Sequence, residues 1–470
     1  MGDTTAAGRL GALCAGLRWE DLPPLVRERS KDLVLDALGV ALRGSIEPST
    51  APGVAVAREA GGAGRASVAG AGFATGSAWA ALANGTAAHA IEMDDVTTES
   101  SLHPGAVVIP AALAVAEERG VSGVRFLEAV VAGYEVVMRA GNALNAASAY
   151  ARGFHPTGTA GVFGAAAAAG RLLGLDAAGL ARALGVAGSM ASGSLEYLAD
   201  GAWTKRLNAG WAAHAGIVAA GLAGAGFTGP ETIFEGRLGF LHAYSDAPAP
   251  DRLLAGLGED WQVLRVSIKP YACCRYNHGV IDGVLKVRRT HGVRPEEVAR
   301  MRLGVLTGGA LLVAEPIEQK RTPGNVVDAQ FSAPFAAAVA LTRGAAGPRE
   351  YTQDNVDDPA IRDLMARTEC YRDPALDAPY PRRWPAAVEV VLRDGRRLSA
   401  RVEAATGEPE NPVPREGLLA KFEQLAGAVL GPSEVAELAE RVLTLDGQTG
   451  MGALGALLRG PGLVDGAVWG

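Results

Sequence analysis

The chain has 470 residues, 49% of them apolar and 20% charged, which is a globular composition and excludes a disordered chain. Its net charge of −7 and the absence of Lys- or Arg-rich runs exclude a nucleic-acid surface or a membrane-surface segment. Residues 1–5 lack signal-peptide features and four cysteines form no disulfide framework, so we expect a cytoplasmic protein.

The first half of the chain is predicted to be helical. Apolar residues recur at helical spacing after Pro23-Pro24, and Gly120, Gly174 and Gly193 separate later helices. These helices are expected at 77–92, 105–118, 122–144, 157–173, 176–190 and 209–225. No strand is expected before Trp261. Segment 208–230 has no charged residue, but its many Ala and Gly residues favour a buried helix of a soluble protein over a membrane span.

The character of the chain changes after a Pro-containing connector at 246–250. Strands are predicted at 262–268, 298–306, 387–392 and 396–402, the last two joined by an Asp394-Gly395 hairpin turn, with helices at 279–289 and 333–342. Helical spacing returns at 418–430, 433–442 and 451–458. The predicted fold is mostly α with an α+β second domain. Residues 1–260 and 406–470 would form a large helical domain, and residues 261–405 an inserted α+β lid.

The segment from His89 to Asp95 concentrates ionisable groups. If the helix continues to Asp95, then His89, Glu92 and Asp95 follow one another on one face. Three acids within four residues repel one another, which raises at least one pKa and suits general acid–base chemistry. The alternative is an acidic helix end in solvent. The same residue types can bind a metal, but no second motif completes a site, and we expect none.

Two histidines share a local design. His103 and His155 each precede a proline and a glycine-containing start of an apolar helix. The residue before proline is pushed out of the helical conformation, and proline is tolerated at the first helical position. Each imidazole should therefore lie at a helix N-terminus, where an anion is favoured. The alternative for each is a simple capping role.

Cationic side chains gather in two other segments. Lys205-Arg206 lies between apolar segments and could clamp a carboxylate, or could be a surface pair. Lys269–His278 holds a dense set of donors beyond a predicted strand, and Cys273-Cys274 within it is expected to be buried packing. No nucleotide-binding loop or serine-hydrolase elbow is present in its required context.

Together these segments resemble the MmgE/PrpD family, which includes 2-methylcitrate dehydratase, cis-aconitate decarboxylase and iminodisuccinate epimerase. The resemblance covers most of the chain. It is carried by 84–95, 102–106, 154–158, 203–207, 269–278 and 328–332. It implies a helical domain from both chain ends, an α+β lid, an active site between them, and a homodimer without metal or organic cofactor.

The resemblance and the residue chemistry together give the expected site. The catalytic candidates are Glu92, Asp95, His103, His155, Lys205 and His278. The substrate-binding candidates are Asp94, Arg206, Lys269, Arg275 and Tyr276. Three departures from the family pattern suggest altered chemistry. Thr97 and Asn208 stand where relatives often carry histidine, and a tyrosine of the decarboxylase branch has no counterpart at 315–321.

The expected function is that of a cofactor-independent lyase or isomerase of a small di- or tricarboxylate. Proton removal next to a carboxylate would resemble that of 2-methylcitrate dehydratase. One alternative is an isomerase, epimerase or cyclase of a specialised pathway that acts on a larger acid. Another is a non-catalytic family member that binds a carboxylate ligand or partner. No nucleic acid or membrane partner is expected.

Overall fold

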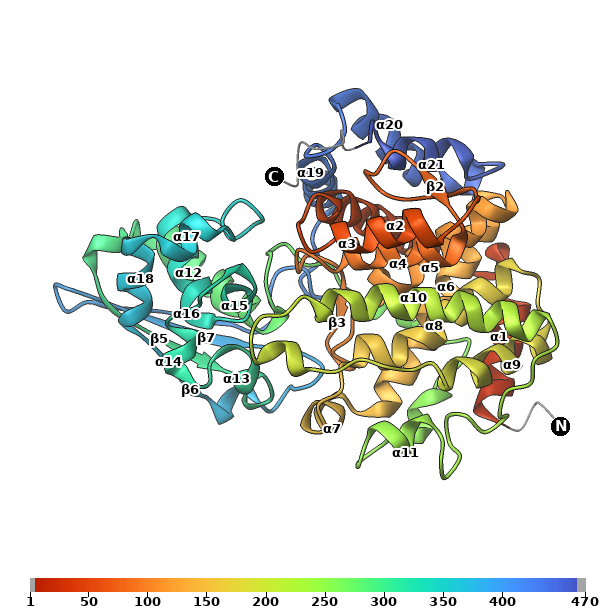
Figure 1. Ribbon diagram of the computed structural model, residues 1–470. Coiled ribbons are helices and arrows are strands. Elements are labelled where there is room, and N and C mark those ends of the chain that lie inside the picture. Colours follow the sequence, from red (N-terminus) through yellow and green to blue (C-terminus); the bar gives the residue numbers. More distant parts are fainter. Residues whose placement is uncertain (1–4, 463–470) are drawn as a thin grey trace. The chain divides into compact units, whose positions relative to one another are not determined.

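The computed structural model describes residues 5–462 of the chain (Figure 1). These residues divide into two compact units. Unit 1 takes residues 5–197, 203–266 and 414–462, and unit 2 takes residues 198–202 and 267–413. Unit 1 is almost wholly helical, whereas unit 2 contains a four-stranded sheet. The predicted fold class, mostly α with a smaller α+β part, is confirmed.

Unit 1 is built from helices drawn from both ends of the chain. From the N-terminal side they are α1 (Ala6–Gly16), α2 (Pro24–Ser45), α3 (Ala51–Ala60), α4 (Ser77–Ala88), α5 (Gly105–Arg119), α6 (Gly123–Leu144), α7 (Ala146–Ala151), α8 (Pro156–Leu172), α9 (Ala177–Gly188), α10 (Thr204–Gly224) and α11 (Phe240–Tyr244). From the C-terminal side they are α19 (Arg415–Ala426), α20 (Pro432–Leu443) and α21 (Gly452–Arg459). Three two-residue strands were not predicted: β1 (Ala66–Ser67), β2 (Ala74–Thr75) and β3 (Val96–Thr97).

The core of unit 1 lies around α8, which is buried along almost its whole length. Helices α6, α5 and α10 pack against it, and α10 also packs against α4 (Figure 1). Small residues allow this last contact. A Cβ atom on Gly85 would lie 2.8 Å from Cα of Gly210, and one on Gly210 would lie 2.3 Å from the carbonyl oxygen of Leu82. The Gly and Ala richness therefore brings helix backbones close together, as expected for a buried α10.

The ends of the helices explain where the functional loops start. Ser122 and Asp176 cap α6 and α9 by accepting hydrogen bonds from backbone N–H groups. His155 is the N-cap of α8, and Pro156 takes its first helical position, as predicted. Two predicted boundaries are wrong. Helix α4 ends at Ala88 and does not reach Glu92, and α10 begins at Thr204, so that it includes Lys205.

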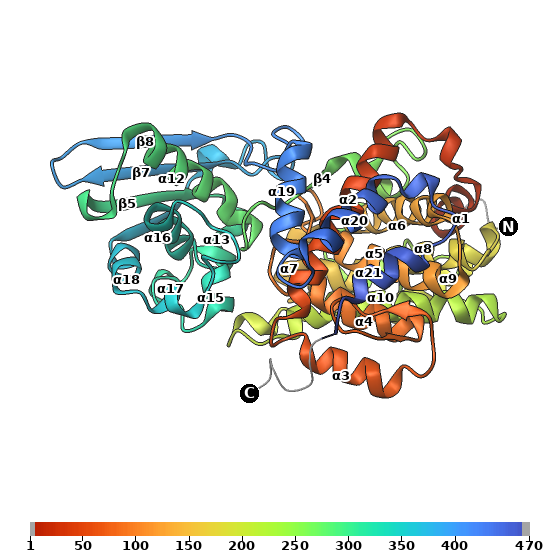
Figure 2. The same cartoon turned by 90° about the horizontal axis from the view of Figure 1, so that it is seen from above.

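The C-terminal helices complete unit 1. Helix α19 packs against α2, and Figure 2 shows these two helices side by side. Between them, Nζ of Lys421 donates to Oδ1 of Asp36 at 2.6 Å and to the carbonyl oxygen of Met93 at 2.8 Å. All three residues are buried. A segment near the end of the chain thus fixes the backbone of the loop that follows α4.

Unit 2 holds a mixed sheet with strand order β6-β5-β7-β8. Its strands are β5 (Val298–Val305), β6 (Thr368–Arg372), β7 (Ala386–Leu392) and β8 (Arg397–Val402). Leu303 pairs in parallel with Cys370 and antiparallel with Val388. The unit's helices are α12 (His278–His291), α13 (Thr307–Val313), α14 (Ile317–Lys320), α15 (Val326–Gln330), α16 (Ala333–Arg343), α17 (Gln353–Asp357) and α18 (Pro359–Ala366). Helix α12 packs against β7 and β8, and α16 packs against α12.

The predicted hairpin turn is confirmed, because β7 and β8 pair antiparallel around Asp394-Gly395. The predicted strand at 262–268 is mostly wrong. Residues Gln262–Arg265 form a 3-10 turn, and only Val266–Ser267 are extended, as β4. Strand β6 was not predicted. Among the helices in residues 5–462, none is both long enough and apolar enough to cross a membrane.

Candidate active site

The loop after α4 carries most of the candidate residues, and its backbone is unusual. Helix α4 ends at Ala88, and the N–H of its C-cap, His89, still bonds to the carbonyl oxygen of Gly85 in the last turn. Three residues later, Glu92 adopts a left-handed conformation with φ of 56°. For a residue other than glycine, this backbone conformation costs roughly 1–2 kcal/mol. The surrounding contacts of Glu92 must therefore hold it there.

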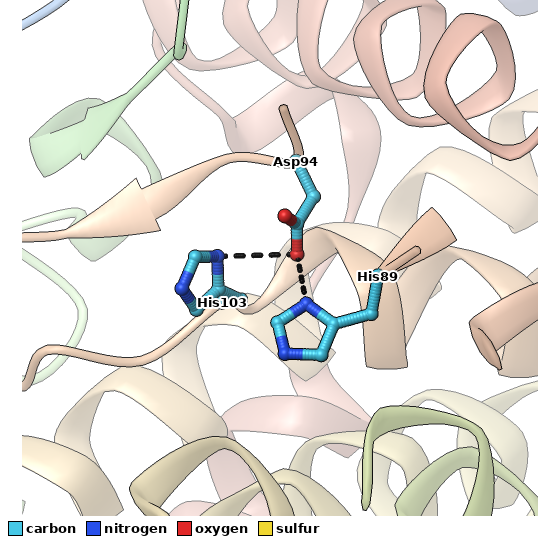
Figure 3. A group of neighbouring side chains, drawn as sticks. All are labelled: His89, Asp94 and His103. Carbon is cyan, nitrogen blue, oxygen red and sulfur yellow. Dashed lines mark hydrogen bonds and ion pairs between the residues drawn. The ribbon is translucent and has the colours of Figure 1, made fainter. Parts of the chain in front are cut away.

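One carboxylate joins two histidines (Figure 3). Oδ2 of Asp94 lies 2.6 Å from Nδ1 of His89 and 3.1 Å from Nδ1 of His103. The ring centroids of the two histidines are 4.8 Å apart, and all three side chains are buried. The His89 contact is a hydrogen bond, in which Nδ1 of His89 donates to the carboxylate and keeps its lone pair on Nε2. Nδ1 of His103 lies within ion-pair distance of the same oxygen. Asp94 contacts both imidazoles, and the expectation that it binds substrate stays a prediction.

His155 brings a third imidazole to the same place. Its ring stacks on His89 at a centroid distance of 5.7 Å. Its Nδ1 lies 3.2 Å from the side-chain nitrogen of Asn208. Burial lowers the pKa of His155 well below its usual value, and the nearby His89, Lys205 and His103 lower it further. His155 is therefore a neutral imidazole at neutral pH.

A buried ion pair lies beside the imidazoles. Nζ of Lys205, in the first turn of α10, donates to Oε1 of Glu92, and both side chains are buried. The next residue, Arg206, is also buried and donates from Nε to the carbonyl oxygen of Ala90 at 3.0 Å. The alternative of a surface pair at 205–206 is wrong. The two cations instead hold the loop that carries Glu92 against α10.

Asp95 supports the start of the next helix. Its Oδ1 accepts from the N–H of Gly105 at 2.7 Å, and its Oδ2 accepts from the Tyr134 hydroxyl at 2.6 Å. A Cβ on Gly105 would lie 2.7 Å from each of Oδ1 of Asp95 and the Tyr134 oxygen, so only glycine leaves room for this arrangement. Burial raises the pKa of Asp95 to about 7. These contacts account for both carboxylate oxygens, and a catalytic role for Asp95 stays a prediction.

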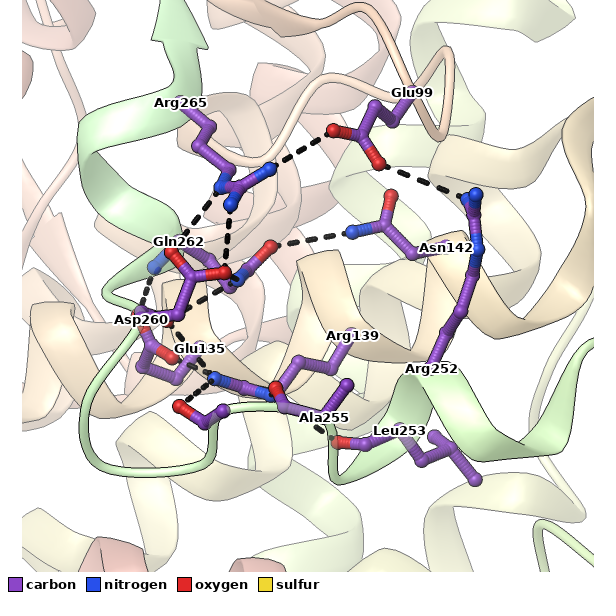
Figure 4. A network of polar contacts seen from close by, with 11 residues as sticks. Glu99, Glu135, Arg139, Asn142, Arg252, Leu253, Ala255, Asp260, Gln262 and Arg265 are labelled. Atoms are coloured by element: carbon purple, nitrogen blue, oxygen red, sulfur yellow. Dashed lines mark hydrogen bonds and ion pairs between the residues drawn. The ribbon is translucent and has the colours of Figure 1, made fainter. Parts of the chain in front are cut away.

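The loop between Asp95 and His103 is anchored to the rest of unit 1 at Glu99 (Figure 4). Glu99 accepts from Arg265 at 3.0 Å and forms an ion pair with Arg252 at 3.6 Å. The segment that carries these arginines is held to α6, where Arg139 pairs with Glu135 and donates to backbone carbonyls. His103 itself is fixed by its backbone N–H, which donates to Oγ1 of Thr157 at 3.1 Å.

The other four candidates lie in unit 2. Lys269 is fully buried, and Arg275 donates from Nη2 to Oε1 of Glu408 at 2.6 Å. The ring of Tyr276 stacks on Trp384 at a centroid distance of 3.9 Å. His278 begins α12, and its Nε2 lies 3.3 Å from the carbonyl oxygen of Cys273. The expectation that these residues act together with those of unit 1 stays a prediction.

The group of His89, Asp94 and His103 also contains metal-ligand types, with one atom from each within 4.8 Å of the others. The 2.6 Å separation of His89 Nδ1 and Asp94 Oδ2 is that of a charge-assisted hydrogen bond. Two ligands of one zinc ion, each about 2.0–2.1 Å from it, would lie roughly 3 Å apart or more. The distance between His89 and Asp94 therefore fits a hydrogen bond, whereas the 3.1 Å between Nδ1 of His103 and Oδ2 of Asp94 is compatible with either a charged contact or a shared ion.

Two residues of the site were missing from the predicted set. His89 was read as part of a helix face, although its proximity to Asp94 in sequence was a signal. Asn208 was noted only as a departure from the family pattern, and its contact with His155 joins residues 53 positions apart. Nε2 of His89 is buried and has no hydrogen-bond partner within residues 5–462.

The chain is similar to known proteins along most of its length. The MmgE/PrpD N-terminal domain matches residues 8–253, and the MmgE/PrpD C-terminal domain matches residues 271–446. The chain is 29% identical to the cis-aconitate decarboxylase of Aspergillus terreus, over 95% of this chain and 94% of that protein. It is 28% identical to the cis-aconitate decarboxylase-like protein oryM of Aspergillus oryzae (97% and 99% covered) and 27% identical to the cis-aconitate decarboxylase of Mus musculus (82% and 79% covered). Because the two family domains together account for most of its length, the chain belongs to the MmgE/PrpD family.

Proposed function

We propose that this chain is a lyase that breaks a bond next to a carboxylate of a small tricarboxylate, with its proton chemistry at His103. The support is the buried group in unit 1, where three imidazoles, one carboxylate and one ammonium group lie together. Such a group can move a proton and hold an anion away from bulk water. The activity named for the relatives supports a carboxylate lyase.

His103 is the proposed proton carrier. Its Nδ1 faces Asp94, so Nε2 offers the lone pair. A carboxylate in this position orients the imidazole and stabilises the imidazolium that forms when Nε2 takes a proton. His103 can therefore accept a proton from carbon or return one to it. Its backbone contact with Thr157 keeps the ring at the start of α5.

The first substrate to test is cis-aconitate, because it is the acid in the names of the relatives. In its decarboxylation, the bond from carbon to a carboxylate breaks and carbon dioxide leaves. The electron pair moves through the neighbouring double bond, and a proton is added at the far carbon. The imidazolium of His103 would supply this proton, and its conjugate base would be reprotonated from water after each turnover.

Lys205 is the proposed carboxylate anchor. Its ammonium group is buried beside the imidazoles and donates to Glu92. A substrate carboxylate can also bind this ammonium group, because the attraction between opposite charges is stronger where little water surrounds them. Arg206 contributes a second positive charge from the same turn of α10. The two cations would also stabilise charge that develops on substrate oxygens.

The test is a substrate panel in D2O followed by proton NMR. The purified full chain is mixed separately with cis-aconitate, 2-methylcitrate, citrate and iminodisuccinate. We expect cis-aconitate to release carbon dioxide and give a product with one deuterium on carbon. Tight binding of these acids without turnover or exchange would contradict a lyase and would support the non-catalytic alternative. Dialysis against EDTA should leave the rate unchanged, because we propose a reaction without metal or organic cofactor.

A second candidate is dehydration or isomerisation of a related acid. It is favoured by segment 315–321, which lacks the tyrosine expected of the decarboxylase branch, and by Asn208 in place of a histidine. In the dehydration, His103 would remove a proton from carbon and hydroxide would leave as water after protonation by a second acid. Water loss from 2-methylcitrate, with no carbon dioxide from cis-aconitate, would select this candidate.

We further propose that the protein is a homodimer. Three large apolar residues are exposed at a spacing of four, on one side of α10: its N-cap Trp203, and Leu207 and Trp211 within it. Large apolar side chains gathered on one face are typical of contact surfaces between proteins. Light scattering should give twice the chain mass, and Leu207→Glu combined with Trp211→Glu should give the monomer. A wild-type monomer at micromolar concentration would contradict the proposal.

A further inference from the structure

The environment of His155 differs from that of the other two imidazoles of the site. His89 and His103 each face a carboxylate oxygen through Nδ1, whereas Nδ1 of His155 faces the side-chain amide of Asn208 at 3.2 Å. An amide offers either a donor nitrogen or an acceptor oxygen. Which of the two faces His155 decides where the imidazole carries its proton.

The backbone around Ser194 settles the orientation of the amide. The Asn208 side-chain nitrogen also lies 3.4 Å from the carbonyl oxygen of Ser194, and a carbonyl can only accept. This carbonyl is held in place because residues 193–195 pair with residues 153–155. The N–H of His155 donates to Gly193 at 3.0 Å, and the N–H of Leu195 donates to Gly153 at 2.9 Å.

The amide nitrogen therefore has two hydrogens and two acceptors. One hydrogen points to the Ser194 carbonyl and the other to Nδ1 of His155. An imidazole nitrogen that accepts a hydrogen bond carries a lone pair, so the single proton of neutral His155 is on Nε2. The hydrogen bond with Asn208 occupies Nδ1, so the N–H on Nε2 is the group that can donate to a ligand.

We propose that Asn208 is a positioning residue that holds His155 as a neutral imidazole with its proton on Nε2, so that His155 donates a hydrogen bond to a substrate oxygen and does not act as the base. This inference rests on the proposed function. A neutral imidazole can polarise a substrate oxygen in this way without giving up its proton. His103, which faces a carboxylate, then keeps the proton-transfer role.

The surroundings of His155 favour the neutral form. The titratable groups near its ring come from the loop after α4, from the residues before α5, from α10 and from the segment before it: His89, Glu92, His103, Lys205 and Tyr197. Lys205 opposes a second positive charge, and only Glu92 favours one. Burial adds to this opposition, and together they lower the pKa of His155 well below its usual value.

The test uses two substitutions of similar volume at position 208. Asn208→Asp offers only acceptors to Nδ1, which should draw a proton there and favour the imidazolium. Asn208→Leu removes the hydrogen bond without adding charge. The full-length protein is labelled with 15N-histidine, and the His155 signals are identified by their loss in His155→Gln.

We expect wild-type His155 to show a protonated Nε2 and a bare Nδ1 from about pH 6 to about pH 8, and Asn208→Asp to show a protonated Nδ1. With a substrate found in the panel, Asn208→Asp should lower kcat at least about tenfold while KM changes less than about threefold. The kcat of Asn208→Leu should lie between those of wild type and Asn208→Asp. A protonated Nδ1 in wild type, or an unchanged spectrum in Asn208→Asp, would overturn the inference. The spectra need no substrate, so an absence of lyase activity would count against the proposed function alone.

Discussion

Oδ2 of Asp94 lies 3.1 Å from Nδ1 of His103, and both side chains are buried in unit 1. The same oxygen lies 2.6 Å from Nδ1 of His89. One carboxylate thus lies beside two imidazoles. The proposed proton carrier, His103, has this carboxylate at its Nδ1, which favours a lone pair on Nε2. The carboxylate also distinguishes His103 from His155, which faces an amide and not a carboxylate.

Asp94→Asn should lower kcat about a hundredfold or more, because an amide cannot stabilise the imidazolium of His103 by charge. KM should change little, since Asp94 touches the histidines and not the proposed carboxylate anchor. Steady-state kinetics with the substrate identified in the panel measures both constants. Asp251→Asn, a change of the same kind at an exposed position, is the matched control and should keep full activity. Equal rates for the two variants would refute the role given to Asp94.

Lys205→Met should abolish detectable turnover and also destabilise the protein, because it removes the ammonium group that pairs with the buried carboxylate of Glu92. Removing one partner of a buried pair costs about 3–5 kcal/mol, whereas replacing both by apolar groups is often neutral. Urea unfolding should therefore show that Glu92→Leu combined with Lys205→Met recovers much of the stability. The rate should stay low in the double variant. If its activity returned with its stability, Lys205 would have a structural role only.

Lys421→Met tests how the loop after α4 is held. Lys421 contacts Asp36 and the carbonyl oxygen of Met93, which lies between Glu92 and Asp94. We expect a loss of about 3–5 kcal/mol in unfolding free energy and a lower kcat, because the loop loses a fixed point. Asp36→Leu in the same chain removes the stranded acid and should restore stability but not the rate. Wild-type kcat in the double variant would show that this contact does not position the loop.

The stability of the protein should depend on pH through Asp95. Its pKa in the folded protein is about 7, above the ordinary value of 3.8, because the carboxyl is buried. The folded form thus binds this proton more tightly than the unfolded form, and the resulting contribution to stability is lost as pH rises through about 7. Asp95→Asn can still accept from Gly105 and donate to Tyr134. Its unfolding free energy should therefore fall less than that of wild type between about pH 5 and about pH 8. If the unfolding free energies of wild type and Asp95→Asn change in parallel over this pH range, the raised pKa of Asp95 would be contradicted.

The sequence predicted the long helices well, because buried helices such as α5 and α8 are long apolar segments that end near turn residues such as Gly120 and Gly174. It failed where tertiary contacts decide the end of a helix. Helix α4 stops before the acidic run, and the left-handed Glu92 is maintained by Lys205, which lies 113 residues away. A pattern in neighbouring residues cannot reveal a contact between Glu92 and Lys205, which are so far apart in the sequence. Conversely, the apolar spacing predicted this helix only from residue 209, yet α10 begins at Thr204 and includes Lys205.

The same limit applies to the sheet and the site. Strand β6 has mostly exposed, polar residues, and it is extended only because it pairs with β5, so no alternation marked it. The family motifs named His103, His155, Glu92 and Lys205, but not their partners. Asn208 and Lys421 gain their roles from contacts between distant segments. Motif chemistry can therefore select the reacting groups, whereas the tautomers and fixed backbone positions needed three-dimensional structure.

The most direct test is the reaction of cis-aconitate in D2O with wild type and with His103→Gln. If His103 carries the proton, wild type releases carbon dioxide and places one deuterium on the product carbon, and the variant does both at least about a hundredfold more slowly. Folding of the variant is checked by its circular dichroism and its urea midpoint. A folded His103→Gln that turns cis-aconitate over at the wild-type rate would contradict the account.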